Sequence, residues 1–212
     1  MRLVCISDTH SLHHKMSRIP DGDVLIHSGD CTGSGSLPQI DDFSQWFGSL
    51  PHRTKILIAG NHDYCFERHP ISSREMCEKR RITYLQGESI TVGKIVFYGF
   101  PWQPIFRDMA FNARAGELKG RLKLVPEETN VLISHGPALH IFDYIPAEGQ
   151  HVGCYHLARR INQLRNLKAH VCGHIHESYG FATREADGVK FANASICNER
   201  YRPINLPILI DV

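Results

Sequence analysis

Short apolar runs recur along the chain, and each one ends at glycine or polar residues. The runs cover residues 3–6, 24–26, 56–58, 131–133 and 169–172. Uninterrupted apolar runs of this length, without alternating polar positions, are typical of strands buried on both faces of a sheet. The pattern therefore predicts a buried, mostly parallel sheet system with strands over residues 2–7, 24–27, 55–59, 131–134 and 169–172.

Helical periodicity and hairpin signals occupy the segments between these runs. Ile40, Phe43, Trp46, Phe47 and Leu50 follow a helical period and predict a helix over residues 38–50. The remaining expected elements are a short segment at 13–18, helices at about 113–124 and 154–167, hairpins turning at Gly93 and at Asp187-Gly188, and a last strand at 207–210. Strands alternating with helices, followed by hairpins, suit two packed sheets flanked by helices.

No boundary divides this pattern into separate units. The chain has 212 residues, enough for one well-buried core, and it shows no internal repeat, compositional shift or low-complexity linker. We therefore expect a single α/β domain over residues 1–212.

The residues that follow the apolar runs are those of metal sites. The motifs are Asp8-Thr9-His10, Gly29-Asp30, Gly60-Asn61-His62-Asp63, His135-Gly136 and Gly173-His174-Ile175-His176. In open α/β sheets, functional groups gather at the carboxyl ends of the strands, so these motifs should meet at one edge.

Two neighbouring divalent ions need one carboxylate that bridges them, together with neutral imidazoles and oxygen donors. Asp30 is suited to the bridging position. Two groups of residues could complete the coordination spheres of the two ions. One ion could bind Asp8, His10 and one histidine of the His174/His176 pair, and the second could bind Asn61, His135 and the other histidine of that pair. Because residues i and i+2 of an extended segment point to the same side, both histidines of that pair could face the ions.

In this order the motifs resemble the calcineurin-like metallophosphoesterase superfamily, whose pattern is D-x-H, G-D, G-N-H-D/E, H and G-H-x-H. Further stretches look like the compact metallophosphoesterase-domain-containing proteins, a subgroup associated with cyclic-nucleotide phosphodiesterase activity. These stretches include Tyr98-Gly99-Phe100-Pro101-Trp102, Val152-Gly153-Cys154, His176-Glu177-Ser178-Tyr179-Gly180 and Asn193-Ala194-Ser195. The resemblance implies a four-layer α/β/β/α sandwich of two mixed sheets flanked by helices.

The resemblance also implies roles for individual residues. It implies a first metal held by Asp8, His10, Asp30 and His176, a second held by Asp30, Asn61, His135 and His174, a catalytic His62, and substrate contacts from Asn112, Arg114 and Asn193. The arginine-bearing G-D-x-x-D-R signature of protein phosphatases is absent, because Cys31-Thr32-Gly33-Ser34 follows Asp30. That departure argues against a protein-phosphatase activity.

The implied activity is that of a two-metal phosphoesterase. We expect a phosphodiesterase acting on cyclic nucleotides or related phosphodiesters by in-line attack of a metal-bridging hydroxide, with His62 assisting the leaving group. The two divalent ions are expected to be manganese, with iron, zinc or cobalt as alternatives. The alternative functions are a nuclease or a phosphomonoesterase of the same superfamily, or a catalytically silent metal-binding scaffold.

A metal-free rival is a cysteine-dependent phosphatase, since Cys154 and Arg160 have the C-x5-R spacing. The residues between them lack the glycine-rich phosphate cradle that this chemistry requires, which argues against it. Among the other histidines, His13 is a candidate contact to a ligand or to substrate because it lies three residues after His10.

Composition limits the partners and the compartment. The formal net charge is only +2 at pH 7, so a small phosphodiester or nucleotide is expected as partner and nucleic acid is not favoured. The seven cysteines are scattered and never form a C-x-x-C pair, which favours a reducing compartment. No apolar run approaches the roughly 20 residues needed to span a bilayer, and the first strand begins at once, so we expect a cytoplasmic protein without a membrane partner. The sequence does not determine the oligomeric state.

Overall fold

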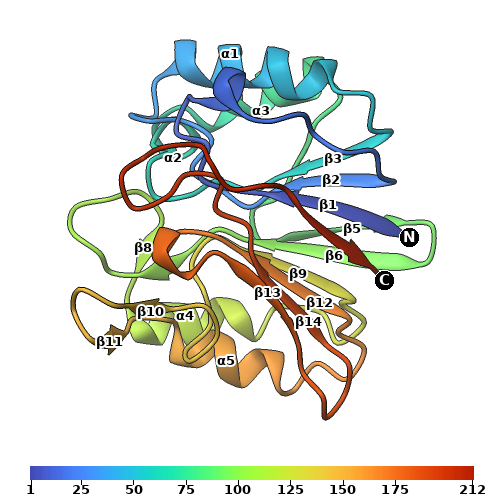
Figure 1. Cartoon of the computed structure of the whole chain (residues 1–212), viewed down its shortest axis with the longest axis vertical. Coiled ribbons are helices and arrows are strands. Elements are labelled where there is room, and N and C mark those ends of the chain that lie inside the picture. Colours follow the sequence, from blue (N-terminus) through green and yellow to red (C-terminus); the bar gives the residue numbers. More distant parts are fainter.

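The computed structural model of the chain describes residues 1–212 and contains two mixed β-sheets packed face to face, with helices on the outer face of each (Figure 1). The expected four-layer α/β/β/α sandwich is therefore confirmed. No helix in it is long and apolar enough to cross a membrane. All seven cysteines are buried as free thiols.

The first sheet has the strand order β15-β1-β2-β3-β4. Its strands are β1 (Arg2–Ile6), β2 (Val24–His27), β3 (Thr54–Leu57), β4 (Thr83–Tyr84) and β15 (Ile208–Asp211). Strands β1 to β4 are parallel, and only β15 is antiparallel to its neighbour β1. The carboxyl ends of β1, β2 and β3 therefore lie together at one edge.

The second sheet has the order β13-β14-β12-β9-β6-β5. Its strands are β5 (Glu88–Val92), β6 (Ile95–Phe100), β9 (Val131–Ser134), β12 (Ala169–Cys172), β13 (Gly180–Thr183) and β14 (Lys190–Asn193). The four inner strands are parallel, whereas β5 and β13 are antiparallel edge strands. An isolated bridge between Ser7 and Ser195 joins the two sheets at the end of β1.

Helices cover the outer faces. They are α1 (Leu37–Ser49), α2 (Cys65–Arg68) and α3 (Pro70–Lys79) beside the first sheet, and α4 (Ala115–Leu122) and α5 (Tyr155–Ile161) beside the second (Figure 1). Short 3-10 turns are η1 (His13–Lys15) and η2 (His176–Ser178), and two-residue strands β7 (Gln103–Pro104), β8 (Asn112–Ala113), β10 (Tyr144–Ile145) and β11 (Gln150–His151) form two small ribbons. Ser36 caps α1 by accepting a hydrogen bond from the backbone of Gln39.

The apolar runs are uninterrupted because each strand is buried on both faces. In β1, Val4 and Ile6 pack toward the cluster formed with Phe43 of α1, whereas Leu3 and Cys5 pack between the two sheets. This two-sided burial removes the usual alternation of polar and apolar residues. It also fixes the strand ends, and therefore the loops that follow them.

The predicted elements agree with the structure except at one helix end, whereas the two-residue strands β4, β7, β8, β10 and β11 were not predicted. The helix expected at 154–167 ends at Ile161, and the following residues form turns. Helices α2 and α3 were not predicted; α3 buries only Ser73 and Cys77, so its sequence carries no apolar period.

Candidate metal centre

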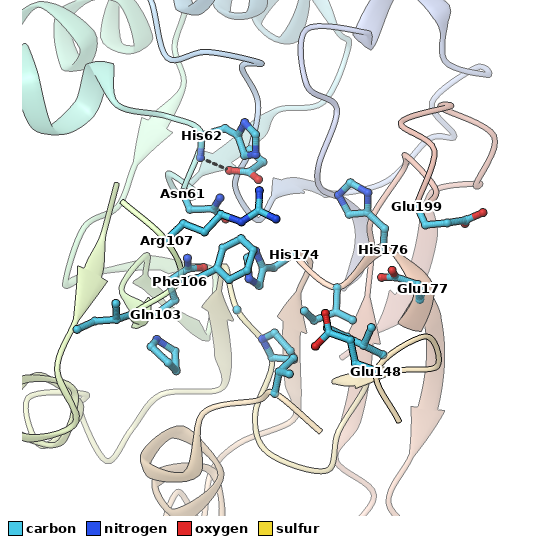
Figure 2. Close-up of a pocket in the computed structure, with 18 of the residues that line it drawn as sticks. Asn61, His62, Gln103, Phe106, Arg107, Glu148, His174, His176, Glu177 and Glu199 are labelled. Atoms are coloured by element: carbon cyan, nitrogen blue, oxygen red, sulfur yellow. Dashed lines mark hydrogen bonds between the residues drawn. The ribbon is translucent and has the colours of Figure 1, made fainter. Parts of the chain in front are cut away.

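The predicted ligand motifs lie together where β1, β2, β3, β9 and β12 end. Asp8 and His10 follow β1, Asp30 follows β2, and His135 follows β9. Figure 2 shows Asn61, His62, His174 and His176 around one cavity. The topology thus brings together all seven residues that the sequence indicates as ligands.

One group consists of Asp8, His10 and His176. The Nε2 atoms of His10 and His176 are 3.2 Å apart, and they lie 3.9 Å and 3.4 Å, respectively, from Oδ1 of Asp8. Asp30 adds its Oδ2 atom 3.8 Å from His10 Nε2. All of these side chains are nearly inaccessible to solvent.

A second group consists of Asp30, His135, His174 and Asn61. His135 Nε2 lies 3.4 Å from Asp30 Oδ2 and 2.8 Å from Asn61 Oδ1. His174 offers a nitrogen within 4.8 Å of the ligand atoms of Asp30 and His135. Asp30 therefore takes part in both groups, and His176 and His174 lie in different groups.

The residues present fit a pair of divalent cations. The Nε2 atoms of His10 and His176 face each other beside the carboxylate oxygens of Asp8 and Asp30. Buried polar atoms are rarely arranged in this way unless an ion accounts for them. One bridging carboxylate with imidazole and amide donors on either side is a suitable donor set for two such ions.

Unusual backbone conformations are concentrated in this region. Asp8, His10, Asp30 and His174 all have a positive φ, at 52°, 44°, 54° and 69°. Such angles are uncommon in residues other than glycine and cost free energy, so they persist where the surrounding structure imposes them. Here they direct consecutive ligands toward one point.

Two glycines leave room for the carboxylates. A Cβ atom at Gly60 would overlap Asp30 Oδ1, and one at Gly173 would overlap Asp8 Oδ2. Asp8 also accepts hydrogen bonds from the backbone of His174 at 3.1 and 3.0 Å. Glycine at these positions thus permits close approach of backbone and ligand.

Hydrogen bonds orient two of the imidazoles. His135 Nδ1 donates to the Ser28 carbonyl at 3.0 Å, and His176 Nδ1 donates to the Asn198 carbonyl at 2.9 Å. In both rings Nε2 is therefore the nitrogen directed at the carboxylates, the arrangement usual for histidine ligands.

The charges and burial of the two ligand groups shift the pKa values of their histidines. Burial disfavours charge on His135, but Asp30 outweighs it and raises the pKa of His135 to about 9. Burial likewise opposes a proton on His176, yet the hydrogen bond and charge of Asp8 raise its pKa to about 9. Burial lowers the pKa of His10 to about 4 and that of His174 to about 3. Although burial alone would raise the pKa of Asp30, His135 holds it well below its usual range.

Ion binding should therefore release protons. At pH 7 His135 and His176 carry protons that must leave before their Nε2 atoms can bind a metal, whereas His10 and His174 are already neutral. We expect about two protons per chain to be released, and apparent affinity to rise with pH up to about 9. Calorimetric titration in buffers of different protonation enthalpy measures this number. Binding without proton release would contradict these assignments.

His62 lies beside the ligands with its ring partly exposed. Its Nδ1 donates to the Gly33 carbonyl at 2.9 Å, so Nε2 is the nitrogen left for another partner. Its backbone N–H donates to Asp30 Oδ1 at 2.7 Å (Figure 2). Its ring also lies within ligand distance of His10 and Asp30, so geometry alone permits either a catalytic or a ligand role.

Asp63 ties two of the motif loops together. Its buried carboxylate accepts hydrogen bonds from the backbone N–H groups of Gly60, Cys31 and Thr32 and from the Thr32 hydroxyl. It therefore holds the loop of Asp30 against the loop of Asn61.

The three residues predicted to contact substrate do not line the cavity. Asn193 is fully buried and donates to the carbonyls of Gly173 and Ile175, so it supports the loop of His174. Asn112 hydrogen-bonds the backbone of Phe106 and Arg107. Arg114 is exposed at the start of α4. Direct substrate contact is thus not supported by their positions; two of them shape loops that border the cavity.

Two other sequence hypotheses fail on geometry. His13 does not line the cavity and faces α1 instead. Cys154 is buried, and burial raises the pKa of its thiol, while Arg160 binds Glu127 and the Val125 carbonyl. A cysteine-dependent phosphatase needs an accessible thiolate beside its arginine, so this rival is excluded.

The cavity beside the ligands has a volume of about 440 Å³. Besides the ligands and His62, its wall contains chiefly Gln103, Phe106, Arg107, Glu148, Glu177, Glu199 and Tyr201. The aromatic loop at residues 101–116 is a plausible substrate wall from its sequence, and it supplies the first three of these residues. Tyr201 has a φ of 53° and its ring lies 4.8 Å from that of His10 and 5.3 Å from that of His176. Glu148, Glu199 and Tyr201 come from irregular loops without periodicity, so no sequence pattern marked them.

Comparison with known proteins agrees with this geometry. The model of the calcineurin-like phosphoesterase family matches residues 1–178. Human metallophosphoesterase domain-containing protein 1 is 39% identical over all of this chain and 71% of its own length, and a UPF0046 protein of Caenorhabditis elegans is 34% identical over all of this chain and 81% of its own. The structure of TT1561 from Thermus thermophilus has the same fold, with a TM-score of 0.63, 10% identity, and coverage of 91% of this chain and 88% of that one.

Proposed function

Because the chain belongs to the calcineurin-like phosphoesterase family, we propose that this metal-dependent phosphoesterase is a phosphodiesterase acting on small diesters, cyclic nucleotides among them. The observation that carries the proposal is Asp30, which is shared by two ligand groups beside a cavity that also contains His62. Two divalent ions bound there would lower the pKa of a water and withdraw charge from phosphoryl oxygens. Manganese is the first ion to test, and iron, zinc and cobalt suit the same donors.

His62 is suited to serve the leaving group. With Nδ1 engaged by the Gly33 carbonyl, a second proton on the ring resides on Nε2 and can pass to a departing alkoxide. The bond from its backbone to Asp30 fixes its position relative to the ligands. We therefore propose His62 as the general acid.

The charges around the cavity favour diesters over monoesters and polynucleotides. One side of the cavity carries three carboxylates, those of Glu148, Glu177 and Glu199 (Figure 2). Arg107 is the only lysine or arginine that lines the cavity. A diester carries one negative charge, whereas a monoester carries about 1.5 to 2 at neutral pH. The three carboxylates repel a polyanionic substrate more strongly than they repel a substrate with a single negative charge. This difference supports a small diester as substrate.

Aromatic rings near the ligands suit a nucleobase. Phe106 and Tyr201 both line the cavity, and the Tyr201 side chain is half exposed. Rings with an open face bind bases by stacking. Together with the single charge, this supports cyclic nucleotides as substrates.

Tyr201→Ala should raise KM for a cyclic nucleotide. Stacking contributes about 1–3 kcal/mol per base, so KM should rise by roughly 5- to 150-fold with little change in kcat. Tyr201→Phe keeps the ring and is the matched control. Steady-state kinetics on a cyclic nucleotide and on cyclic glycerol phosphate, which has no base, makes the comparison. An equal effect on both substrates would refute stacking.

The proposal is tested by a screen of metal-reconstituted protein. The substrates are 2′,3′-cyclic and 3′,5′-cyclic nucleotides, linear diesters, phosphomonoesters and nicked DNA. We expect the highest kcat/KM on small diesters. A preference for monoesters would indicate a phosphomonoesterase, and a preference for DNA would indicate a nuclease. Metal binding without turnover of any substrate would indicate a scaffold.

The cytoplasmic location of the protein stays a prediction.

A further inference from the structure

A second cluster of histidine and aspartate lies outside the cavity, where η1 meets α1. His13 and His14 belong to η1, and Asp42 projects from α1. His13 Nε2 lies 3.1 Å from Asp42 Oδ2, and His14 Nε2 lies 3.3 Å from Asp42 Oδ1. None of the three residues lines the cavity described above.

His13 is the unexplained member of this cluster. It is only 1% exposed, with its ring 5.5 Å from that of Phe43 and 5.0 Å from that of Trp46. His13 Nδ1 has no hydrogen-bond partner, and Nε2 has only the Asp42 carboxylate beside it. Buried polar side chains nearly always have partners, so a cation held between Nε2 and the carboxylate would account for this arrangement.

The spacing of the three side chains matches a tetrahedral cation. Ligand atoms bound to zinc at 2.0–2.2 Å are about 3.3–3.6 Å apart along a tetrahedral edge. Each imidazole Nε2 lies near that separation from one oxygen of Asp42, His13 at 3.1 Å from Oδ2 and His14 at 3.3 Å from Oδ1. One ligand atom from each residue lies within 4.8 Å of the others. His14 and Asp42 are exposed, so a fourth position would face water.

We propose that His13, His14 and Asp42 bind a divalent cation of the zinc class, separate from the two-ion centre. Two imidazoles and one carboxylate form a donor set that zinc prefers, and cobalt takes the same geometry. The ion pair of Asp42 with the exposed His14 uses Oδ1, and Oδ2 faces Nε2 of His13 at 3.1 Å. A cation bound to one carboxylate oxygen satisfies Nε2 of His13 and leaves the fourth position to water.

The bound cation would join η1 to α1. The segment between β1 and η1 carries Asp8 and His10, so the ion would tether the segment that bears two predicted ligands of the two-ion centre. Its role would be structural, since none of its ligands lines the cavity. Binding only to the folded chain would raise the melting temperature.

The test is the metal stoichiometry of the full chain. Chelator-stripped protein is dialysed against buffered zinc and its metal content measured, and cobalt is titrated in parallel and followed by its visible absorption. We expect about three equivalents in the wild type and about two in His14→Ala and in Asp42→Asn, with the zinc-induced rise in melting temperature reduced in both. His14 is exposed, so its replacement should not affect folding. Asp41→Asn, on the same helix but outside the cluster, is the matched control and should retain about three.

A double variant separates this site from the two-ion centre. Asp30→Asn protein should keep about one equivalent, which His14→Ala should then remove. Wild-type protein without an additional equivalent, or with one weaker than roughly 100 μM, would overturn the proposal. An additional equivalent that survives both His14→Ala and Asp42→Asn would overturn it as well. If the two-ion centre failed to bind, the wild type would hold a single His14-dependent ion, so the two failures are distinguishable.

Discussion

Asp30→Asn should cost the protein both ions of the two-ion centre at once. Asp30 Oδ2 lies 3.8 Å from His10 Nε2 and 3.4 Å from His135 Nε2, so it contributes to both ligand groups. The amide keeps the shape of the side chain, and its oxygen can still accept from the His62 backbone, but it removes the shared negative charge. We expect each ion to bind at least about 100-fold more weakly, and diesterase activity to fall by at least the same factor.

The matched comparison is His174→Ala, which removes a residue that lies only in the group with His135. It should weaken one ion and spare the other. Elemental analysis after dialysis at limiting manganese gives the stoichiometry of both variants. An Asp30→Asn protein that still binds both ions with unchanged affinity would refute the bridging role. The bridging role would also be refuted if His174→Ala lost both ions and Asp30→Asn lost neither.

His62→Ala should separate catalysis from metal binding. If Nε2 of His62 gives a proton to the leaving group, its removal should lower kcat on diesters of aliphatic alcohols by roughly 10² to 10⁴. The loss should shrink for p-nitrophenyl esters, because p-nitrophenolate departs without a proton. Steady-state kinetics on both substrate types measures the difference.

Metal content decides the remaining ambiguity at His62. Its ring lies within ligand distance of His10 and Asp30, so the variant must be analysed for metal as well as activity. Retention of both ions together with a leaving-group-dependent loss supports the general acid. Equal losses on both substrate types would contradict it, and loss of an ion would make His62 a ligand.

Much of the fold could be predicted because its strands are buried on both faces. Burial makes runs such as Val131–Ser134 uninterrupted in sequence, and turn residues such as Gly93 mark the ends of hairpins. Helix α3 was not predicted because it exposes half of its residues and buries only Ser73 and Cys77. Its position depends on tertiary contacts that leave no periodic pattern.

The grouping of the predicted ligands followed from topology, because each lies directly after a strand and parallel strands end at one edge. The cavity wall could not be predicted in the same way. Tyr201 and Glu148 come from irregular loops, and their positions depend on packing between segments distant in sequence. Asn193 was predicted to contact substrate because it lies in a matching motif. In the structure its side chain instead donates hydrogen bonds to backbone carbonyls of the loop that carries His174.

The most direct test is the metal dependence of diester hydrolysis by the wild-type chain. Protein stripped by chelator and then freed of chelator is assayed on bis-p-nitrophenyl phosphate, alone and with added manganese, zinc, cobalt or ferrous iron. The ligand groups around Asp30 predict negligible turnover in the stripped protein and recovery on addition of metal, with manganese the most effective. Full activity in protein shown by elemental analysis to contain no metal would contradict the account.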